Sequence, residues 1–172
     1  MRKVKVELKH LLTSNFINNK FNRIDVLVIK HSIEQYLKDE TPSIRDVLPL
    51  GLFRLMKPYI NQIDNIRLVE KIMYSPKLTI AGQVDCVAEY NGKLSVIDFK
   101  TANKERIEEW VENYFLQCTA YACMYEETFN EDIDQIVVLI AGEDGSMIPF
   151  VKEKKDYEET LVKSIQEFYD KV

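Results

Sequence analysis

The sequence predicts an α/β protein in which helices pack on a mixed β-sheet. Some segments repeat apolar residues every three or four positions, as helices do, and others are dense in β-branched and aromatic residues, as strands are. These segments follow one another as helix, three strands, helix, two strands, helix, without an internal repeat. The chain has 172 residues, of which 46% are hydrophobic, with only 5 Gly and 5 Pro. This composition suits one folded domain and excludes a disordered or low-complexity chain.

The chain begins with a basic arm over residues 1–25. Residues 1–30 hold seven Lys or Arg and two acidic residues, although the net charge of the whole chain is −5. An acidic protein binds a polyanion only through a local basic patch or through bound cations. The arm is therefore either a contact for such a partner or a solvated start of the chain.

Two helical regions follow the arm. The first is a helix over 25–40, whose apolar residues have helical spacing: Val26, Ile29, Ile33 and Leu37. The second is a helical connection over 41–65, which Pro49 and Pro58 are expected to break into short pieces because proline lacks the amide donor that a helix interior needs.

Three antiparallel strands come next, over 66–74, 83–90 and 93–100. They are rich in β-branched and aromatic residues, and turn signals at 75–77 and 91–92 separate them. The regular alternation of their side chains predicts that one face of each strand enters the core.

The rest of the chain alternates between the two patterns. A long amphipathic helix is predicted over 105–127 and a buried strand over 133–142. A further strand over 146–153 contains Pro149, which is typical of a sheet edge, and a final helix is expected over 155–170. No linker divides these elements, so we interpret residues 1–172 as a single domain.

The dipeptide at 91–92 carries the most specific prediction. Asn-Gly favours a two-residue hairpin, and its register places Asp85 directly opposite Asp98, with Lys100 on the same face. The side chains expected to point the other way, into apolar packing, are Val84, Cys86, Ile97 and Phe99. Opposed carboxylates repel unless a proton or cation lies between them, and oxygen ligands of this kind favour Mg²⁺ or Mn²⁺. The alternative is a solvated aspartate pair with a surface salt bridge to Lys100.

Four further residues are weaker candidates for the same site. Gln117 and Tyr121 are spaced i and i+4 on one helix face, and Tyr121 fits core packing equally well. Glu70 interrupts the first strand, and the sequence does not fix its register against the aspartates. His31 fits either a metal ligand or an exposed helical histidine.

These residues, in this order, resemble the PD-(D/E)xK nuclease superfamily in its RecB-like branch. The ordered elements are His31, Glu70, Gly82-x-x-Asp85, Asp98-Phe99-Lys100-Thr101 and Gln117-x-x-x-Tyr121. Within that branch, the run over 85–101 is most similar to the mitochondrial genome maintenance exonucleases and their bacteriophage relatives. The resemblance implies a restriction-endonuclease-like core of α-β-β-β-α-β order with a catalytic core over 26–141 and a C-terminal strand and helix over 142–172. The sequence departs from the superfamily motif at Val84, where proline is usual.

The resemblance implies a metal-dependent DNA exonuclease that acts at single-stranded ends and uses one or two Mg²⁺ or Mn²⁺ ions. The implied metal ligands are His31, Asp85, Asp98 and the backbone carbonyl of Phe99. The implied catalytic residues are Lys100, Asp98, Asp85 and Glu70, and the implied DNA contacts are Gln117, Tyr121 and Thr101. An endonuclease or flap-processing nuclease on the same fold, an inactive DNA-binding module, and a scaffold unrelated to nucleic acid remain as alternatives.

Cysteine usage and hydropathy bear on the compartment. Cys86, Cys118 and Cys123 have neither C-x-x-C spacing nor a fourth partner, which argues against a zinc or iron–sulfur site. No apolar run approaches the roughly 18 residues of a membrane span, and the first residues lack the pattern of a secretory signal. We expect a cytoplasmic protein of a bacterium or of a phage-infected cell, with no membrane contact. Its role would lie in DNA replication, recombination or repair, with a protein of those processes as a candidate partner.

Overall fold

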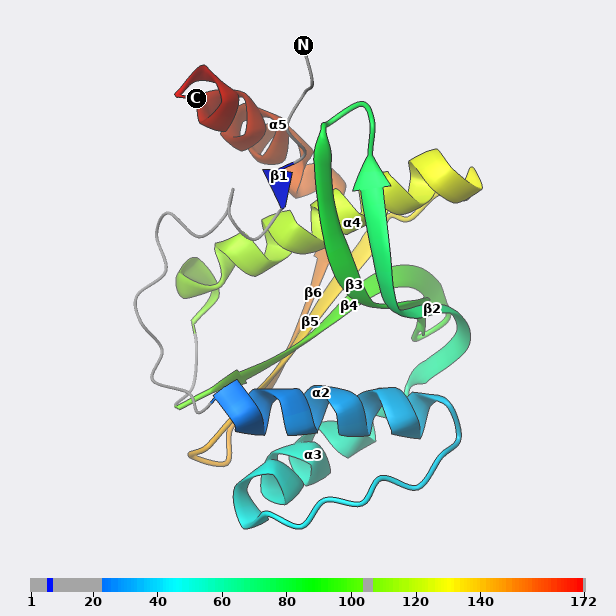
Figure 1. The fold of residues 1–172 in the computed structure, drawn as a ribbon, viewed down its shortest axis with the longest axis vertical. Helices are drawn as coiled ribbons and strands as arrows, with labels where there is room; N and C mark the ends of the chain where they lie inside the picture. The colour runs from blue at the N-terminus through cyan, green and yellow to red at the C-terminus, as the bar shows by residue number, and fades with distance from the viewer. Residues whose placement is uncertain (1–5, 8–22, 104–106, 172) are drawn as a thin grey trace.

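The computed structural model describes residues 6–7, 23–103 and 107–171. In this part of the chain a mixed six-stranded sheet lies between two layers of helices (Figure 1). The strands are β1 (Val6–Glu7), β2 (Ile63–Ser75), β3 (Ile80–Tyr90), β4 (Lys93–Ala102), β5 (Gln135–Gly142) and β6 (Met147–Glu153). The helices are α2 (Arg23–Leu37), α3 (Val47–Ile60), a short 3₁₀ turn η2 (Glu108–Trp110), α4 (Glu112–Phe129) and α5 (Lys155–Asp170). None of the described helices combines the length and the apolar character that crossing a bilayer requires.

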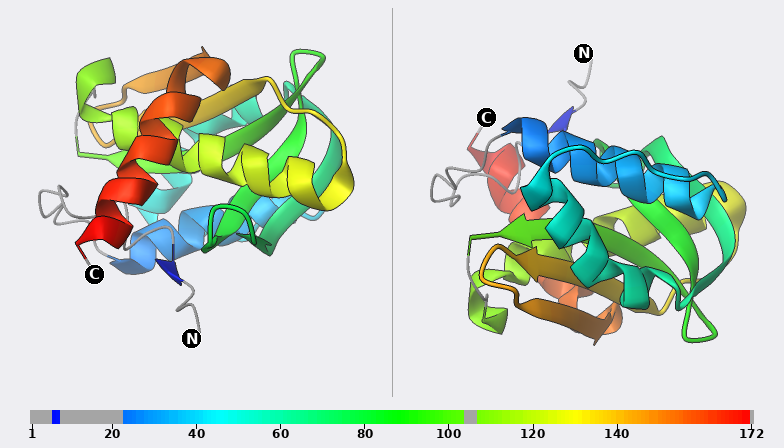
Figure 2. Two further views of the ribbon diagram at one scale, coloured as in Figure 1. Left: turned by 90° about the horizontal axis from the view of Figure 1, so that it is seen from above. Right: turned by 90° about the horizontal axis from the view of Figure 1, so that it is seen from below.

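The two helical layers cover opposite faces of the sheet. Helices α4 and α5 pack on one face, and α2 and α3 pack on the other (Figure 2). Each face has its own apolar core: the α4 side includes Phe115 and Met124, and the α2/α3 side includes Ile33 and Met56. This two-sided burial explains why β5 is buried along its whole length.

The sheet combines antiparallel and parallel pairs. β2 and β4 pair antiparallel with β3, β4 pairs parallel with β5, and β5 pairs antiparallel with β6. Helix α4 makes the crossover that a parallel pair needs between β4 and β5. β1 pairs parallel with Ile80 and Ala81 of β3. Because β2 pairs with the same two residues from one edge of β3, β1 lies at the other edge, where β4 pairs farther along the strand. Pro149 lies in the edge strand β6, as predicted.

The hairpin register is confirmed. β3 and β4 pair from Tyr90↔Lys93 to Cys86↔Ile97, and both turn residues have positive φ, 51° at Asn91 and 78° at Gly92, as a type I′ turn requires. The ladder ends there, and no described backbone pair joins the two strands beyond it. Asp85 and Asp98 therefore lie at the point where β3 and β4 diverge.

The prediction that prolines break residues 41–65 into short pieces is wrong. α3 is one helix over Val47–Ile60. Pro49 occupies its first turn, where amide donors have no partner inside the helix, and Pro58 lies two residues before its end. Neither proline therefore interrupts the helix.

Two other boundaries differ from the prediction. α4 begins at Glu112 rather than near residue 105, after the 3₁₀ turn η2, and β2 is longer at both ends than the predicted strand over 66–74. Most of the predicted basic arm over 1–25 lies outside the described residues, apart from the two-residue strand β1 and the start of α2.

Candidate active site

At the candidate site, the side chain of Asp85 takes the place of a backbone hydrogen-bond acceptor. In a continued β3–β4 ladder, Phe99 would form the next hydrogen-bonded pair with Val84. Instead the Phe99 N–H donates to Oδ2 of Asp85 at 3.0 Å. The Asp85 carboxylate thus accepts the hydrogen bond that a backbone carbonyl of β3 would accept in a continued ladder. This bond holds it beside Asp98, the residue before Phe99.

The alternation of β3 breaks at the same place. Cys86, Ile97 and Phe99 pack in the α2/α3 core as predicted, but Val84 packs in the α4 core, so its predicted orientation is wrong. On β2, Glu70 adopts φ 49°, a conformation that is uncommon for residues other than glycine. Both strands are therefore irregular beside Asp85, and this irregularity directs the carboxylate into the gap between the diverging strands.

Asp98 and Lys100 form a buried ion pair. Lys100 Nζ donates to Asp98 Oδ1 at 2.9 Å and lies 2.7 Å from Oδ2, which has no well-oriented hydrogen-bond donor among the described residues. Asp85 is 5% exposed and Asp98 is 2% exposed. The alternative of solvated aspartates with a surface salt bridge is therefore wrong, because both carboxylates are inside the protein.

Burial and the neighbouring charges set the protonation of the cluster. Burial, together with the charge of Asp85, raises the pKa of Asp98 to about 6 even though Lys100 opposes the shift. Burial alone would raise the pKa of Asp85, but the ammonium groups of Lys30 and Lys100 outweigh it and hold that pKa below its usual range. Burial lowers the pKa of Lys100, yet Asp98 and Asp85 raise it further, so the net shift is upward and Lys100 stays charged.

Helix α2 brings Lys30 to the cluster and leaves His31 outside it. Lys30 Nζ donates to Asp85 Oδ1 at 2.6 Å. The side chain of His31 is 68% exposed, and its Nδ1 lies 3.8 Å from Oε2 of Glu34. The structure therefore does not bring the predicted metal ligand His31 to the aspartates, and it reveals Lys30 as a site residue that sequence reasoning had counted only as part of the basic start.

Glu70 lies beside Asp85. The pairs Val69↔Cys86 and Lys71↔Val84 flank it, which places Glu70 opposite Asp85 across β2 and β3. Its Oε2 accepts a hydrogen bond from Gln83 Nε2 at 2.8 Å. Burial, together with the charge of Asp85, raises the pKa of Glu70 to about 7. Glu70 is thus the neighbour of Asp85 across β2 and β3.

The raised pKa of Glu70 predicts a pH dependence of stability in the metal-free protein. The folded state holds a proton on Glu70 that the unfolded chain, with a pKa near 4.5, has already released, so the stabilisation present at low pH is lost as pH rises to about 7. Glu70→Gln should remove that part of the slope. Urea unfolding in EDTA between pH 4.5 and 8 measures it, and parallel curves for the two proteins would contradict the assignment.

Helix α4 supplies the outer contacts of the ion pair. Gln117 Oε1 accepts from Lys100 Nζ at 3.3 Å, and Gln117 Nε2 donates to the Tyr121 hydroxyl at 3.3 Å. The Tyr114 ring lies 5.0 Å from the ammonium of Lys100. Gln117 and Tyr121 therefore position Lys100, and Tyr121, only 4% exposed, also packs in the core.

Gly82 makes room for Tyr121. A Cβ at position 82 would lie 2.9 Å from both Cε1 and the hydroxyl oxygen of Tyr121. The glycine therefore serves close packing between β3 and α4.

We expect Gly82→Ala to displace Tyr121, loosen Gln117 and lower the stability by about 1–3 kcal/mol. Gly51→Ala is the matched control, because a Cβ at this exposed helical position meets nothing within 4 Å and should stabilise α3 by about 0.5–1 kcal/mol. Thermal melts of the two variants check the prediction. A Gly82→Ala protein that melts like the wild type would contradict it.

The remaining predicted site residues, Phe99 and Thr101, lie on β4. The N–H and C=O groups of one strand residue point to the same side, so the Phe99 carbonyl faces the gap into which its N–H donates to Asp85. Alternation along β4 points the Thr101 side chain to the opposite face of the sheet from Lys100. The structure thus brings the Phe99 carbonyl to the aspartates and separates the Thr101 side chain from Lys100.

The oxygen atoms at this point suit a hard divalent cation. Within residues 6–7, 23–103 and 107–171, no three His, Cys, Asp or Glu side chains are gathered in a ready metal-binding group. Two buried carboxylates and one main-chain carbonyl are present, however, and Asp98 Oδ2 still lacks a hydrogen-bond donor. Mg²⁺ commonly takes one or two carboxylates and keeps several waters, so this donor set fits it.

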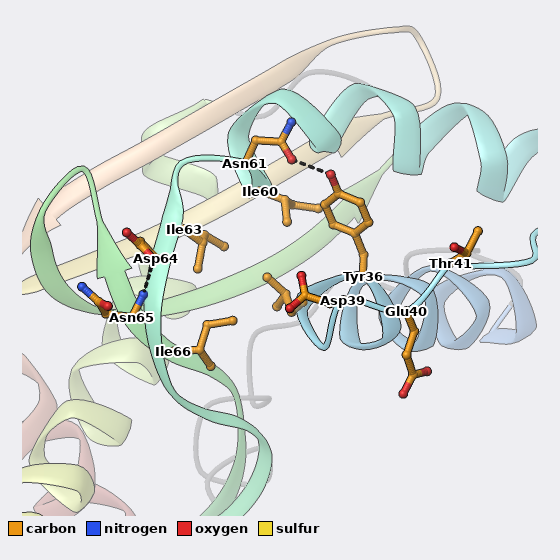
Figure 3. A pocket seen from close by; sticks show the side chains of 11 residues that line it. Tyr36, Asp39, Glu40, Thr41, Ile60, Asn61, Ile63, Asp64, Asn65 and Ile66 are labelled. Atoms are coloured by element: carbon orange, nitrogen blue, oxygen red, sulfur yellow. Dashed lines mark hydrogen bonds between the residues drawn. The ribbon is translucent and has the colours of Figure 1, made fainter.

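A separate surface pocket of about 650 Å³ lies between the end of α2, the end of α3 and the start of β2 (Figure 3). Its lining includes Asp39, Glu40 and Asp64, and Tyr36 crosses it with a 2.7 Å hydrogen bond to Asn61. None of its lining residues is a predicted site residue. Its acidic lining disfavours phosphate, so DNA is not expected to bind there.

Part of this sequence is similar to curated exonucleases. Mitochondrial genome maintenance exonuclease 1 of Homo sapiens is 32% identical over 113 residues, which cover 62% of this chain and 33% of the human protein. The protein of the same name from Xenopus tropicalis is 32% identical over 100 residues, which cover 56% of this chain and 28% of that protein. The match thus spans about a third of the length of these relatives.

The structural comparison supports the fold. The crystal structure of an exonuclease-like protein from Eubacterium rectale superposes with a TM-score of 0.58 over 95% of this chain and 70% of that chain, at 8% identity. The predicted α/β fold with a restriction-endonuclease-like core is confirmed. The family model of the PD-(D/E)XK nuclease superfamily matches residues 21–171. The chain therefore belongs to the PD-(D/E)XK nuclease superfamily.

Proposed function

We propose that this protein is a metal-dependent deoxyribonuclease that hydrolyses phosphodiester bonds at single-stranded DNA ends. The observation that carries the proposal is the burial of Asp85 and Asp98 at the point where β3 and β4 diverge, with the half-buried Lys100 hydrogen-bonded to Asp98. Exonucleases among the relatives support the exonuclease activity.

The proposed metal ligands are Asp85, Asp98 and the carbonyl of Phe99, with Mg²⁺ or Mn²⁺ as the ion and room for one or two ions beside Glu70. When bound, the ion supplies Lewis-acid stabilisation of the charge that develops on the phosphate. Asp85 is held for this role by the Phe99 amide at 3.0 Å, and Asp98 by Lys100 at 2.9 Å. His31 is left out of the set because its side chain is exposed.

Lys100 acts as a fixed positive charge. Its pKa lies above the usual range, so it is protonated at neutral pH and does not accept the proton of the attacking water. Its ammonium orients that water by hydrogen bonding and stabilises the negative charge that grows on the phosphate oxygens. Gln117 holds the lysine through a hydrogen bond of 3.3 Å, and a second hydrogen bond of 3.3 Å joins Gln117 to Tyr121.

The DNA strand needs positive charge that the acidic chain provides only locally. We propose that the basic arm over 1–25 contacts the phosphates of the strand. The cysteines Cys86 and Cys118 are buried and unpaired, which suits a reducing compartment, and we place the protein in the cytoplasm of a bacterium or phage-infected cell. A protein of DNA replication or recombination is the proposed partner.

An assay on labelled DNA tests the activity and its mode together. Linear single strands blocked at the 5′ or the 3′ end are compared with circular single strands, each in Mg²⁺, Mn²⁺ or EDTA. We expect digestion of a linear substrate that is lost in EDTA, with circles left intact. Cleavage of circles would instead indicate an endonuclease, and no cleavage of any substrate would contradict the proposal.

A further inference from the structure

The ammonium group of Lys30 is hydrogen-bonded to Asp85, the carboxylate that a metal ion would need. Its Nζ is 2.6 Å from Asp85 Oδ1 while the Phe99 amide donates to Oδ2, so both oxygens of Asp85 already have a donor. The lysine side chain is 30% exposed, whereas that of Asp85 is 5% exposed. The contact therefore joins a buried carboxylate to a cation that has a path to solvent.

We propose that Lys30 is an exchangeable counter-ion of Asp85, which leaves the carboxylate when a divalent ion binds there and then contacts a phosphate of the DNA strand. The inference rests on the metal site of the proposed function. An ammonium and a divalent ion on one carboxylate oxygen would lie within a few ångströms of each other, and a buried site screens their repulsion poorly. The flexible four-carbon stem lets the ammonium swing away without moving α2.

Charge balance favours the same exchange. In the metal-free site, the ammonium groups of Lys30 and Lys100 offset the carboxylates of Asp85 and Asp98. A divalent ion added to this set would leave two surplus positive charges when Glu70 is protonated and one when Glu70 is ionised, and withdrawal of Lys30 removes one charge in either case. The withdrawn ammonium belongs to the more exposed partner of the pair, 30% against 5% for Asp85, so it has the access to solvent that a contact with a DNA phosphate needs. Binding of the ion and binding of DNA are thereby coupled.

Mn²⁺ binding to the full chain, followed by electron paramagnetic resonance, tests the first half of the exchange. Lys30→Met and Lys30→Gln should both bind Mn²⁺ about tenfold more tightly or better, because they remove a charged competitor for Asp85. Lys30→Arg should stay close to the wild type. Lys38→Met is the matched control on the same helix, since Lys38 pairs with Glu34 at 2.7 Å and should leave the affinity unchanged.

DNA binding tests the second half. With Lys100 kept and a nuclease-resistant phosphorothioate strand used to suppress cleavage, fluorescence anisotropy of the labelled single strand gives the DNA affinity with and without Mn²⁺. Mn²⁺ should raise that affinity several-fold more with Lys30 present than in the Lys30→Met protein. An equal increase in the two proteins would overturn the phosphate contact.

The outcomes separate the two proposals. Wild-type protein that binds no Mn²⁺ would end the proposed metal site and with it the proposed function. Wild-type protein that binds Mn²⁺, with unchanged or weaker binding by the Lys30 variants, would overturn only the exchange. If Lys30→Met does not fold without metal, Lys30→Gln decides, because it keeps a hydrogen-bond donor to Asp85.

Discussion

Asp98→Asn should reduce DNA cleavage by about 10³-fold or more while the protein stays folded. The substitution removes the negative charge with which Asp98 would hold the ion. It keeps an oxygen that can accept from Lys100, and it removes a buried charge whose pKa is raised to about 6, so the melting temperature in EDTA should change by no more than about 4 °C. Cleavage rates in Mg²⁺ and thermal melts measure both effects.

Asp39→Asn is the control for this substitution. Asp39 is exposed in the acidic pocket away from the carboxylate cluster and adopts φ 60°, which asparagine also tolerates. It should leave both the rate and the melting temperature unchanged. Normal turnover by the purified Asp98→Asn protein would show that this carboxylate is not a metal ligand.

Lys100→Met should lower both the cleavage rate and the stability, whereas Asp98→Asn should lower the cleavage rate alone. It removes the positive charge that stabilises the reacting phosphate, so cleavage should fall by about 10²–10³-fold. It also leaves Asp98 and Asp85 with less compensation inside the protein, so the free energy of unfolding in EDTA should fall by about 3 kcal/mol. Because the carboxylates remain, Mn²⁺ should still bind and should recover the lost stability.

Denaturant unfolding with EDTA or Mn²⁺ distinguishes the two roles. The Lys100→Met protein should respond to Mn²⁺ at least as strongly as the wild type, whereas the Asp98→Asn protein should hardly respond. Lys152→Met is the control, since Lys152, near the end of β6, pairs with the exposed Glu108 of η2, and the substitution should change neither activity nor metal response. An unaffected cleavage rate in Lys100→Met would remove the lysine from the mechanism.

The hairpin explains how far the sequence could predict the site. Asn91-Gly92 fixes the β3–β4 register locally, so the approach of Asp85 to Asp98 follows from a two-residue turn. The end of the ladder and the turn of Val84 to the other face depend on packing against α4 and on Glu70, which are distant in sequence. Alternation alone cannot show where two strands part.

Helix α2 shows that local spacing can be judged from the sequence, whereas contacts between residues far apart in the sequence cannot. The apolar stripe through Ile29 and Ile33 leaves position 31 on the opposite side of the helix, which explains the exposure of His31, and position 30 borders the stripe. That Lys30 would contact Asp85, 55 positions along the chain, required the packing of α2 against the sheet. The order of motif residues favoured the histidine, whereas the packing of α2 brings the lysine to Asp85.

A crystal of the protein soaked in Mn²⁺ and measured at the manganese absorption edge tests the central claim most directly. The account predicts an anomalous peak between β3 and β4, with carboxylate oxygens of both Asp85 and Asp98 at about 2.0–2.2 Å. A peak that touches only one of these two aspartates, or that lies elsewhere while the site stays empty, would contradict it.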